Sequence, residues 1–421
     1  MDILVLMAEE IITGLDIGSS HIRIVVGQSM PGEDGKPKLH ITGAVDVESS
    51  GMHKGSISSM EDAVSSISKV LERAERMTGV AINAAWISIA GHNILVQESR
   101  GVVGVSRPDG EINEEDVERA IDAARTVATP SNYEILHVLP KSFTVDGQQG
   151  IKDPVGMNGI RLEVDALIIQ TLSSQIKNLT KSIYRTGLEI DDLVFGPLAT
   201  AESVLTQRQK ELGVCVIDIG ASTTSIAVFE EGDIFHTAVL PIGGDHITND
   251  IAIGLRTSLE VAEKVKMAVG QAVPDHVNKK DEFSLREFGS SEEEFAKSRF
   301  IAEIIEARAE EIFERVDDEL RKIDRSGMLP VGVVLTGGTM KLSGMVDVGK
   351  RILRLPAVVG RPVDISSVID EVQDPAYATA VGLAVWGFAI SSVSRKRFKL
   401  SIKGVDQVAD QMRKWLKSLI P

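Results

Sequence analysis

The feature that most constrains this chain is a turn that occurs twice. Residues 13–27 read TGLDIGSSHIRIVVG, and residues 214–229 read VCVIDIGASTTSIAVF. In both segments an apolar run leads into Asp-Ile-Gly, a small hydroxyl cluster and a second apolar run, which predicts strand, tight turn and strand. One such turn is common in ordinary hairpins. Two matching turns half a chain apart predict two similar halves that clamp a phosphate-bearing ligand between them.

Both turns carry residue types that suit a phosphate and a cation together. Glycine lets the backbone approach an anion, successive N–H groups surround phosphate oxygens, and hydroxyls add hydrogen bonds. The carboxylates of Asp16 and Asp218 need a divalent cation, usually held through water, before they can face phosphate. Two further glycine turns, in LPIGGDHITNDIA and VVLTGGTMKLSG, precede predicted helices. We therefore expect a nucleotide with Mg²⁺ in a cleft between the halves.

Composition argues against several other classes of protein. The chain has 421 residues and a net charge of −16, so we expect no nucleic-acid partner. It contains no Walker-type phosphate loop, six-residue dinucleotide fingerprint or histidine metal-ligand spacing. The single cysteine, Cys215, lies in an apolar run, which favours core packing in a reducing compartment. No apolar run approaches the length of a membrane span, so we expect a cytosolic body.

Strand and helix patterns alternate along the chain, as in an α/β fold. Residues 61–77 and 295–324 have helical apolar periodicity, and AAWISIAG reads as a buried strand. Residues 91–172 predict a small α+β module with a helix at 112–128, and Pro140 is expected to divide one of its segments into two strands. The polar, broken stretch 270–291 predicts a surface excursion, and 374–390 predicts a helix rich in small residues.

The C-terminal segment differs from the acidic body in charge. Residues 391–421 contain eight basic and two acidic residues. From residue 405 apolar positions recur on one helical face, which predicts an amphipathic helix on an anionic membrane surface. A flexible basic linker at 391–404 would precede it, and a terminal helix packed on the body is the alternative. The expected membrane-binding residues are Val405, Val408, Met412, Arg413, Lys414, Trp415, Leu416, Lys417, Leu419 and Ile420.

These motifs resemble the actin/Hsp70/sugar-kinase superfamily and, within it, the FtsA family of bacterial cell division proteins. The resemblance covers nearly the whole chain, and segments such as LHVLPKSFTVDGQQGIKDPVGMNGIRLEV and PIGGDHITNDIAIGLRTSLEVAEKVK are distinctive of FtsA. It implies an actin-like ATPase fold, with two similar halves around a nucleotide cleft and an inserted FtsA-type α+β subdomain. ATP and Mg²⁺ are the cofactors that it implies.

The resemblance also suggests roles for individual residues. Arg23 falls where actin has a phosphate-contacting lysine. Glu263 and Lys266 resemble a pair that contacts ribose and adenine, although a solvated ion pair would explain them nearly as well. Asp16 and Asp218 would hold Mg²⁺ through water. The expected nucleotide-binding residues are Asp16, Gly18, Ser19, Ser20, Arg23, Asp218, Gly220, Ser222, Thr223, Gly243, Gly244, Glu263, Lys266, Gly337, Gly338 and Thr339.

Four positions, Ala221, Ser222, Ser225 and Gly196, depart from the family pattern. The second loop usually reads Gly-Gly-Gly-Thr-Thr-Asp, whereas this chain has Ala221 and Ser225 within Gly-Ala-Ser-Thr-Thr-Ser. In related ATPases a Gln or Glu near the PLATA segment orients the attacking water, but the residue before Pro197 here is Gly196. We therefore expect nucleotide binding with at most slow hydrolysis, and we assign no catalytic residue.

The resemblance implies the following division of the chain. Subdomain 1A would comprise 1–90, 173–206 and 367–390; 1C would be 91–172; 2A would comprise 207–241 and 307–366; and 2B would be 242–306. It further implies filaments of the protein with itself, binding of the FtsZ C-terminal peptide by 242–306, and contacts with later divisome membrane proteins. The expected location is the cytoplasmic face of the cell membrane at the division site. A PilM-type pilus-assembly protein and an actin-fold sugar kinase are the alternatives.

Overall fold

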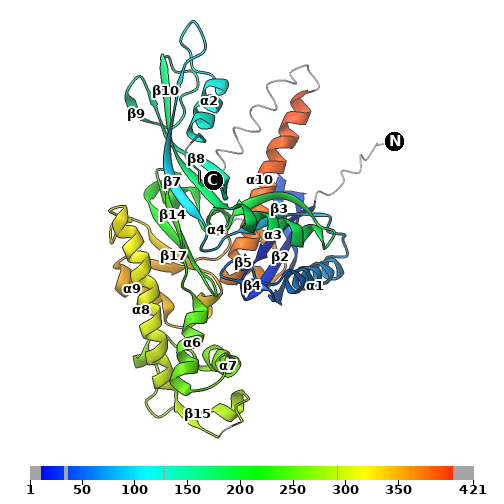
Figure 1. Ribbon diagram of the computed structural model, residues 1–421, viewed down its shortest axis with the longest axis vertical. Helices are drawn as coiled ribbons and strands as arrows, with labels where there is room; N and C mark the ends of the chain where they lie inside the picture. Colours follow the sequence, from blue (N-terminus) through cyan, green and yellow to red (C-terminus); the bar gives the residue numbers. More distant parts are fainter. Residues whose placement is uncertain (1–10, 33–36, 127–128, 292, 364, 402–421) are drawn as a thin grey trace.

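The computed structural model describes residues 11–32, 37–126, 129–291, 293–363 and 365–401. The expected membrane helix at 405–421 lies outside these ranges. Within them, no helix combines the length and the apolar character needed to cross a membrane. Figure 1 shows an elongated molecule with the inserted subdomain at one end and helices α6 and α7 near the other.

Two sheets of the same topology form the body of the molecule. In the first half the order is β3–β2–β1–β6–β11, and in the second half it is β14–β13–β12–β17–β18. Each sheet contains an antiparallel hairpin, β1–β2 or β12–β13, whose first strand is parallel to β6 or β17. The repeated sequence motif therefore corresponds to a repeated fold unit, and the expected two-halved α/β architecture is confirmed.

The bounds of these strands follow the sequence patterns closely at the two hairpins. The first sheet comprises β1 (Ile11–Ile17), β2 (His21–Pro31), β3 (Pro37–Glu48), β6 (Ala84–Ile89) and β11 (Glu189–Phe195), with β19 (Ser366–Ser367) beside β3. The second sheet comprises β12 (Val214–Ile219), β13 (Thr224–Glu230), β14 (Asp233–Leu240), β17 (Gly332–Thr336) and β18 (Ala357–Val359).

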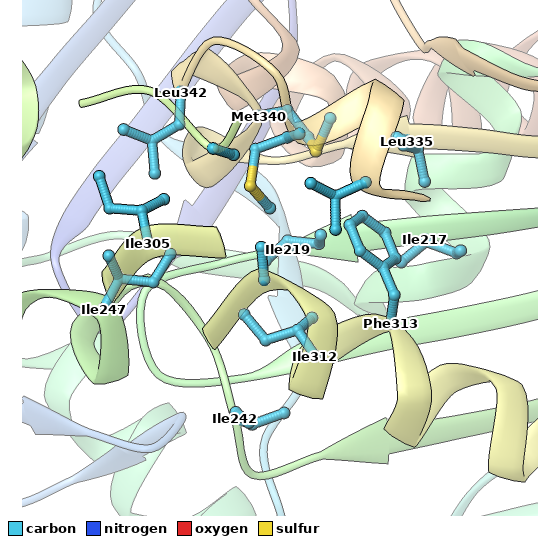
Figure 2. Packing of buried hydrophobic residues seen from close by; sticks show 14 of the residues in the cluster. Ile217, Ile219, Ile242, Ile247, Ile305, Ile312, Phe313, Leu335, Met340 and Leu342 are labelled. Carbon is cyan, nitrogen blue, oxygen red and sulfur yellow. The ribbon is translucent and has the colours of Figure 1, made fainter. Parts of the chain in front are cut away.

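Helices lie between the two sheets and on their outer faces. Between them, α4 (Gly196–Val204) and α10 (Ala378–Ser401) share one core with both sheets. On the outer face of the first sheet lie α1 (Met60–Thr78) and α3 (Ser173–Tyr184). The outer face of the second is covered by α6 (Gly244–Leu255), α8 (Ser298–Lys322) and α9 (Met345–Leu353). Figure 2 shows Ile312 and Phe313 of α8 packed near Ile217 and Ile219 of β12.

Helix α10 approaches its neighbours closely because glycines occupy the contact points. A Cβ at Gly14 of β1 would lie 2.3 Å from the carbonyl oxygen of Ala380. A Cβ at Gly382 would lie 1.7 Å from the carbonyl oxygen of Ala199 in α4. The small residues of 374–390 thus allow one helix to pack against both a strand and a second helix.

The inserted subdomain is a four-stranded sheet with one helix. Its strands are β7 (Leu95–Gly104), β8 (Tyr133–Val145), β9 (Gln148–Ile151) and β10 (Arg161–Leu172), in the order β7–β10–β8–β9, and its helix is α2 (Glu114–Ala124). Helix α2 is shorter than the expected 112–128 and begins at a capping box formed by Asn113 and Asp116. The expected inserted α+β subdomain is confirmed.

The expectation that Pro140 divides a strand is wrong. Strand β8 runs through it, and its register with β10 shifts where Asp165 pairs with Ser142 and Ala166 pairs with Pro140. A bulge therefore absorbs the proline. On its other side β8 pairs with β9 only from Phe143 onward, so the missing N–H of Pro140 interrupts no ladder there.

Three further segments differ from the expectations. The stretch 270–291 contains η1 (Pro274–His276), β15 (Glu282–Ser284) and η2 (Leu285–Phe288). It buries Phe283 and Leu285 in the outer core of the second half. Strand β15 pairs with β16 (Phe295–Lys297). Helix α10 continues to Ser401, so the basic segment expected as a flexible linker starts within a helix. The patterns left unassigned β4 (Met52–His53), β5 (Ser56–Ile57) and α5 (Gln207–Leu212). The short helix η3 (Gly338–Lys341) lies in the expected glycine turn, and α7 spans Leu259–Val269.

Candidate functional site

A cleft of about 820 Å³ lies between the two halves. It is lined by both Asp-Ile-Gly turns, by the start of α6, by α7 and by the turn after β17. Every expected nucleotide-binding residue except Gly243 lines it. Gly243 lies behind the second turn, where a Cβ would be 2.6 Å from the carbonyl oxygen of Gly220. The structure therefore brings the expected residues together around one space.

The two turns have matching backbone geometry. The N–H of Gly18 donates to the carbonyl of His21 at 3.0 Å, and the N–H of Gly220 donates to that of Thr223 at 2.9 Å. The register also matches, because Asp16 pairs with Arg23 in the first hairpin and Asp218 with Ser225 in the second. Arg23 and Ser225 consequently occupy equivalent positions, so the two turns present different chemistry on one backbone.

The neighbours of each aspartate in its strand determine where its carboxylate points. Leu15 and Ile17 pack into the outer core of the first half, and Ile217 and Ile219 pack into that of the second (Figure 2). Successive side chains of a strand point to opposite faces of the sheet. Asp16 and Asp218 therefore lie on the inner faces, where both line the cleft.

Asp218 is held by the two central helices. The Oγ1 hydroxyls of Thr379 in α10 and Thr200 in α4 donate to its Oδ2 at 3.1 and 3.4 Å. Burial, and after it the facing carboxylate of Asp16, raise the pKa of Asp218 to about 6, although the two hydroxyls and the charge of Arg23 oppose the shift. The carboxylate is thus destabilised in the free protein and would gain from a cation.

Asp16 has a similar environment in the first half. The Oγ of Ser88, at the end of β6, donates to its Oδ1 at 2.6 Å. Burial raises the pKa of Asp16, and the hydrogen bond from Ser88 and the charge of Arg23 only partly counteract this. Two desolvated carboxylates therefore face the same cleft from opposite halves.

Arg23 is a cation whose donors are only partly used. Its guanidinium is 3.8 Å from the carboxylate of Asp46 and lies over the ring of Tyr377, 5.7 Å from the ring centre. Its Nε is buried and has no hydrogen-bond partner among the described residues. A buried N–H without a partner is costly, so an anion in the cleft would satisfy it.

The turn after β17 is pressed against the second Asp-Ile-Gly turn. Gly337 has a φ of +94°, and a Cβ there would lie 2.3 Å from Oδ1 of Asp218. Thr339 donates its hydroxyl to the carbonyl of Gly220 at 2.9 Å, and the N–H of Gly244 donates to the same oxygen at 2.9 Å. Glycine at 337 is thus required by conformation and by space.

Lys266 is buried, which excludes a solvated ion pair for this residue. Its side chain is 8% exposed, and its Nζ lies 2.6 Å from Glu263, 2.8 Å from the hydroxyl of Thr248 and 3.3 Å from the carbonyl of Gly244. Glu263 remains 46% exposed toward the cleft. The pair therefore joins α7 to the start of α6 at the wall of the cleft.

Helix N-termini add positive potential to the same space. Gly196 and Pro197 begin α4, Gly244 and Asp245 begin α6, and Thr379 lies in the first turn of α10, and all of them line the cleft. The helix dipole favours anions near a helix start, and at α6 this dipole is what remains, because the N–H groups of Gly244 and Asp245 already donate to the carbonyls of Gly220 and Ala221. The cleft can therefore hold a phosphate chain while its carboxylates hold a cation.

Several residues of the site were missed by sequence reasoning. Ser88 supports Asp16, Thr200 and Thr379 support Asp218, and Asp245 accepts a hydrogen bond from Ser222 at 2.7 Å. Ser88 ends a predicted strand and Thr200 lies within PLATA, so both positions carried a weak signal. Nothing in the sequence joins Thr379 to Asp218, because only the packing of α10 brings them together.

Comparison with known proteins gives consistent relatives over nearly the full length. Family models described as "Cell division protein FtsA" and "SHS2 domain inserted in FTSA" match residues 215–382 and 91–170. The cell division protein FtsA of Pseudomonas aeruginosa is 37% identical over 402 residues, covering 96% of this chain and 94% of that protein. The FtsA of Bacillus subtilis is 38% identical, covering 95% and 89%, and that of Escherichia coli K12 is 34% identical, covering 90% of each.

Solved structures with the same fold are more distant in sequence. The PilM-PilN type IV pilus biogenesis complex matches with a TM-score of 0.64 at 17% identity, over 89% of this chain and 98% of that chain. MreB 5 of Spiroplasma citri bound to AMPPNP matches with a TM-score of 0.53 at 14% identity, over 92% and 98%. These likenesses establish the actin-like fold.

The raised pKa of Asp218 predicts a pH-dependent stability of the ligand-free protein. The folded state holds this proton up to about pH 6, whereas the unfolded chain releases it near pH 4. The free energy of unfolding should therefore fall as pH rises between these values. Asp218→Asn removes the effect, so its melting temperature should gain several degrees on the wild type between pH 4.5 and 7.5.

Differential scanning fluorimetry measures this difference across the pH range. Asp122→Asn on α2, where the side chain is 60% exposed, is the control and should run parallel to the wild type. A constant offset between Asp218→Asn and the wild type would contradict the expectation.

Proposed function

The chain belongs to the FtsA family of cell division proteins, and we propose that it binds ATP, polymerises on the cytoplasmic membrane and anchors FtsZ filaments there. The observation that carries the nucleotide part is the pair of matching turns whose carboxylates face one cleft from opposite halves. The division role follows from the family. The remaining parts of the proposal rest on the surfaces and sequence patterns described below.

The residues of the cleft fit a nucleoside triphosphate. Arg23 offers a buried N–H without a partner among the described residues, and the starts of α4, α6 and α10 line the same space. The turn at Gly337 and the buried Lys266 also line the cleft, and the nucleoside would lie beside them. ATP is the nucleotide proposed, in keeping with the AMPPNP-bound relative of the same fold.

The charge of the cleft supports a requirement for Mg²⁺. Its lining contains seven acidic residues against three lysines and arginines, so a free triphosphate would be repelled. No group of three or more potential ligands that could hold a metal is found in the described part of the chain. Mg²⁺ commonly keeps several waters and binds through one or two carboxylates and the phosphates. Asp16 and Asp218 would hold it in this way.

The proposed hydrolysis is slow. Gly196 stands at the start of α4 and lines the cleft without a side chain, and Ser225 stands where the family pattern has an acid. Binding groups are therefore present, but a group that orients or deprotonates water is absent from these two positions. Bound nucleotide would then act by favouring one conformation of the protein over another.

The proposed FtsZ peptide site is an apolar surface between α6 and α8. Ile253 is 75% exposed and Phe300 is 43% exposed. Phe300 lies beside the helix that carries Ile253, since a Cβ at Gly254, the next residue of α6, would be 3.7 Å from its ring. Large exposed apolar side chains on adjacent helices suit the apolar anchors of a bound peptide. The surface lies within the 242–306 region that family resemblance associates with FtsZ.

Membrane attachment is proposed for residues 405–421, which lie outside the described part of the structure. The sequence places Val408, Met412, Trp415 and Leu419 on one helical face, with Arg413, Lys414 and Lys417 on or beside the other. A helix over these residues would be about 24 Å long, and each basic residue near an anionic surface adds about 1 kcal/mol. The protein would thereby lie on the cytoplasmic face of the membrane at the division site.

Filament formation and contacts with later divisome proteins are proposed from the presence of the inserted subdomain. A sugar kinase of the same fold would phosphorylate a substrate in this cleft, and a PilM-type protein would assemble with pilus components. Relatives of 34–38% identity are all division proteins, and this favours the FtsA-type function over both alternatives.

Loss of either cleft carboxylate should weaken the binding of Mg-ATP. Asp16→Ala and Asp218→Ala each remove one cation contact, and at least a tenfold loss of affinity at pH 7.5 is expected by isothermal titration calorimetry. Binding by the wild type should also weaken below about pH 6, where Asp218 becomes protonated. Asp122→Ala serves as control. Unchanged affinity in both cleft variants would remove the basis of the proposed nucleotide site.

Installing an amide at Gly196 should increase ATP turnover. A Cβ there would lie 3.5 Å from the Cβ of Ala90 and beyond 3.7 Å from its next neighbours, so a Cβ fits, and the position lines the cleft. Gly196→Gln would place a group able to orient water at the start of α4. Phosphate release should rise several-fold over the wild type, while Gly196→Ala should leave it unchanged. Rapid turnover by the wild type would contradict the slow-hydrolysis proposal.

Adding a charge to the apolar surface should abolish peptide binding. Ile253→Glu places a carboxylate in the centre of the proposed site, and the affinity for a synthetic FtsZ C-terminal peptide should fall at least tenfold by fluorescence anisotropy. Met77→Glu on α1, where the side chain is 56% exposed, is a matched control on the other half. Equal affinity of Ile253→Glu and the wild type would place the peptide elsewhere.

Deleting residues 405–421 should release the protein from anionic liposomes in a sedimentation assay. Trp415→Glu should weaken binding strongly, because it places a charge on the apolar face of the helix. Raising the salt concentration should weaken binding of the full chain as well. If the truncated chain pellets as well as the full chain does, the tether lies in another segment.

A further inference from the structure

The short hairpin formed by β4 and β5 lies between the first Asp-Ile-Gly turn and the base of the inserted subdomain. At its turn, the N–H of Gly55 donates to Oγ of Ser19 at 3.0 Å. Both residues line the cleft. The hairpin is therefore joined directly to a residue expected to contact phosphate.

A buried glutamine on α3 joins this hairpin to the last strand of the inserted subdomain. Nε2 of Gln175 donates to the carbonyls of Gly55 and Ala90, both at 2.9 Å. Its Oε1 accepts a hydrogen bond of 3.0 Å from the hydroxyl of Thr171, in β10. Gln175 is 7% exposed, so its amide is used for these three contacts rather than for solvent.

The chain also enters the inserted subdomain against the same hairpin. A Cβ at Gly55 would lie 2.6 Å from Cα of Gly91, which shows how closely the two backbones approach. Nδ1 of His92 is 3.2 Å from the carbonyl of Lys54, and Nδ2 of Asn93 donates to Ser56 at 3.4 Å. Both connections of the inserted subdomain to the body are thus fastened to one hairpin.

We infer that Gln175 is a positioning residue that couples phosphate in the cleft to the base of the inserted subdomain. The inference rests on the proposed nucleotide site. A serine hydroxyl has one proton to donate and lone pairs to accept. The N–H of Gly55 uses an accepting position of Ser19, which leaves the hydroxyl proton for a phosphate oxygen.

Phosphate bound in this way would strengthen the hydrogen bonds that follow. Chains of hydrogen bonds polarise one another, so a charge accepted at Ser19 tightens the contacts of Gly55, Gln175 and Thr171. The coupling is reciprocal: a change at the base of the inserted subdomain alters nucleotide affinity by the same factor. Ligands of that subdomain would therefore regulate the cleft.

The inserted subdomain has a second attachment, to the second half of the molecule. Nζ of Lys152 lies 2.5 Å from the carboxylate of Asp233 in β14. The ring of Phe235 lies between two cations, 4.6 Å from Nζ of Lys141 and 4.9 Å from the guanidinium of Arg325. A shift at the base of the subdomain would therefore reach the second half as well as the first.

Two variants interrupt this series of hydrogen bonds at different places. Gln175→Leu removes the contacts with both Gly55 and Thr171, and Mg-ATP affinity should fall about fivefold, the lower end of measured couplings. Thr171→Val keeps the shape and the contact with Gly55, so affinity should change less than twofold while the link to β10 is lost. Asn178→Leu, at an exposed position one turn further along α3, is the matched control and should behave as the wild type.

Hydrogen exchange of the full chain is measured with and without Mg-ATP. If Gln175 and Thr171 only stabilised the fold, nucleotide would not change exchange at the base of the inserted subdomain. In the wild type, nucleotide should slow exchange both in the two Asp-Ile-Gly turns and at the base of the inserted subdomain, in 91–95 and 168–175. In Thr171→Val the turns should still be protected, whereas protection at 168–175 should be lost. Calorimetry of the same samples measures binding independently.

The outcomes separate this inference from the proposed function. If the wild type binds Mg-ATP but exchange at 91–95 and 168–175 does not change, the coupling is overturned and the nucleotide site stands. The same holds if Thr171→Val transmits protection as the wild type does. If calorimetry detects no Mg-ATP binding by the wild type, both the nucleotide site and the coupling are overturned.

Discussion

The structure depends on placing two desolvated carboxylates opposite each other. Asp16 and Asp218 each lie between two apolar residues that the outer core of their own half buries, so neither strand can turn its carboxylate outward without exposing that core. The cost appears as the raised pKa of both groups. A fold that maintains such a cost at the junction of its halves gains most when a cation and an anion fill the cleft together.

The two central helices determine how the halves meet. Helices α4 and α10 pack between the sheets, where the Oγ1 atoms of Thr200 and Thr379 lie 2.8 Å apart and both lie within hydrogen-bond distance of Asp218. Since Gly382 lets α10 contact α4 backbone to backbone, these hydroxyls have little freedom to move apart. The charge state of Asp218 is therefore linked to the packing of α4 against α10, the two helices that lie between the sheets.

The sequence predicted the elements that depend on local patterns of residues, but it did not predict features that depend on packing between distant segments. Both hairpins and the module at 91–172 could be predicted because alternation, glycine turns and helical periodicity are local signals. The prediction of a break at Pro140 was wrong because a bulge between β8 and β10 accommodates the proline. The prediction of a surface excursion at 270–291 missed that Phe283 and Leu285 are buried there. The supporting contacts of Ser88, Thr379 and Gln175 bridge 72, 161 and 120 positions of the chain, so no local pattern could reveal them.

The difference between the two hairpins is the basis for the proposal that this chain binds nucleotide but hydrolyses it slowly. The backbone of the turns is the same, yet the position paired with the aspartate is Arg23 in one and Ser225 in the other. The first therefore supplies a fixed cation for phosphate, while the second supplies only a hydroxyl where an acid would help to hold water or metal. With Gly196 contributing no side chain, nothing at these positions lowers the barrier for water attack. The inserted subdomain, fastened to the first turn through Gly55 and Gln175, would then respond to how long nucleotide stays bound rather than to how often it is cleaved.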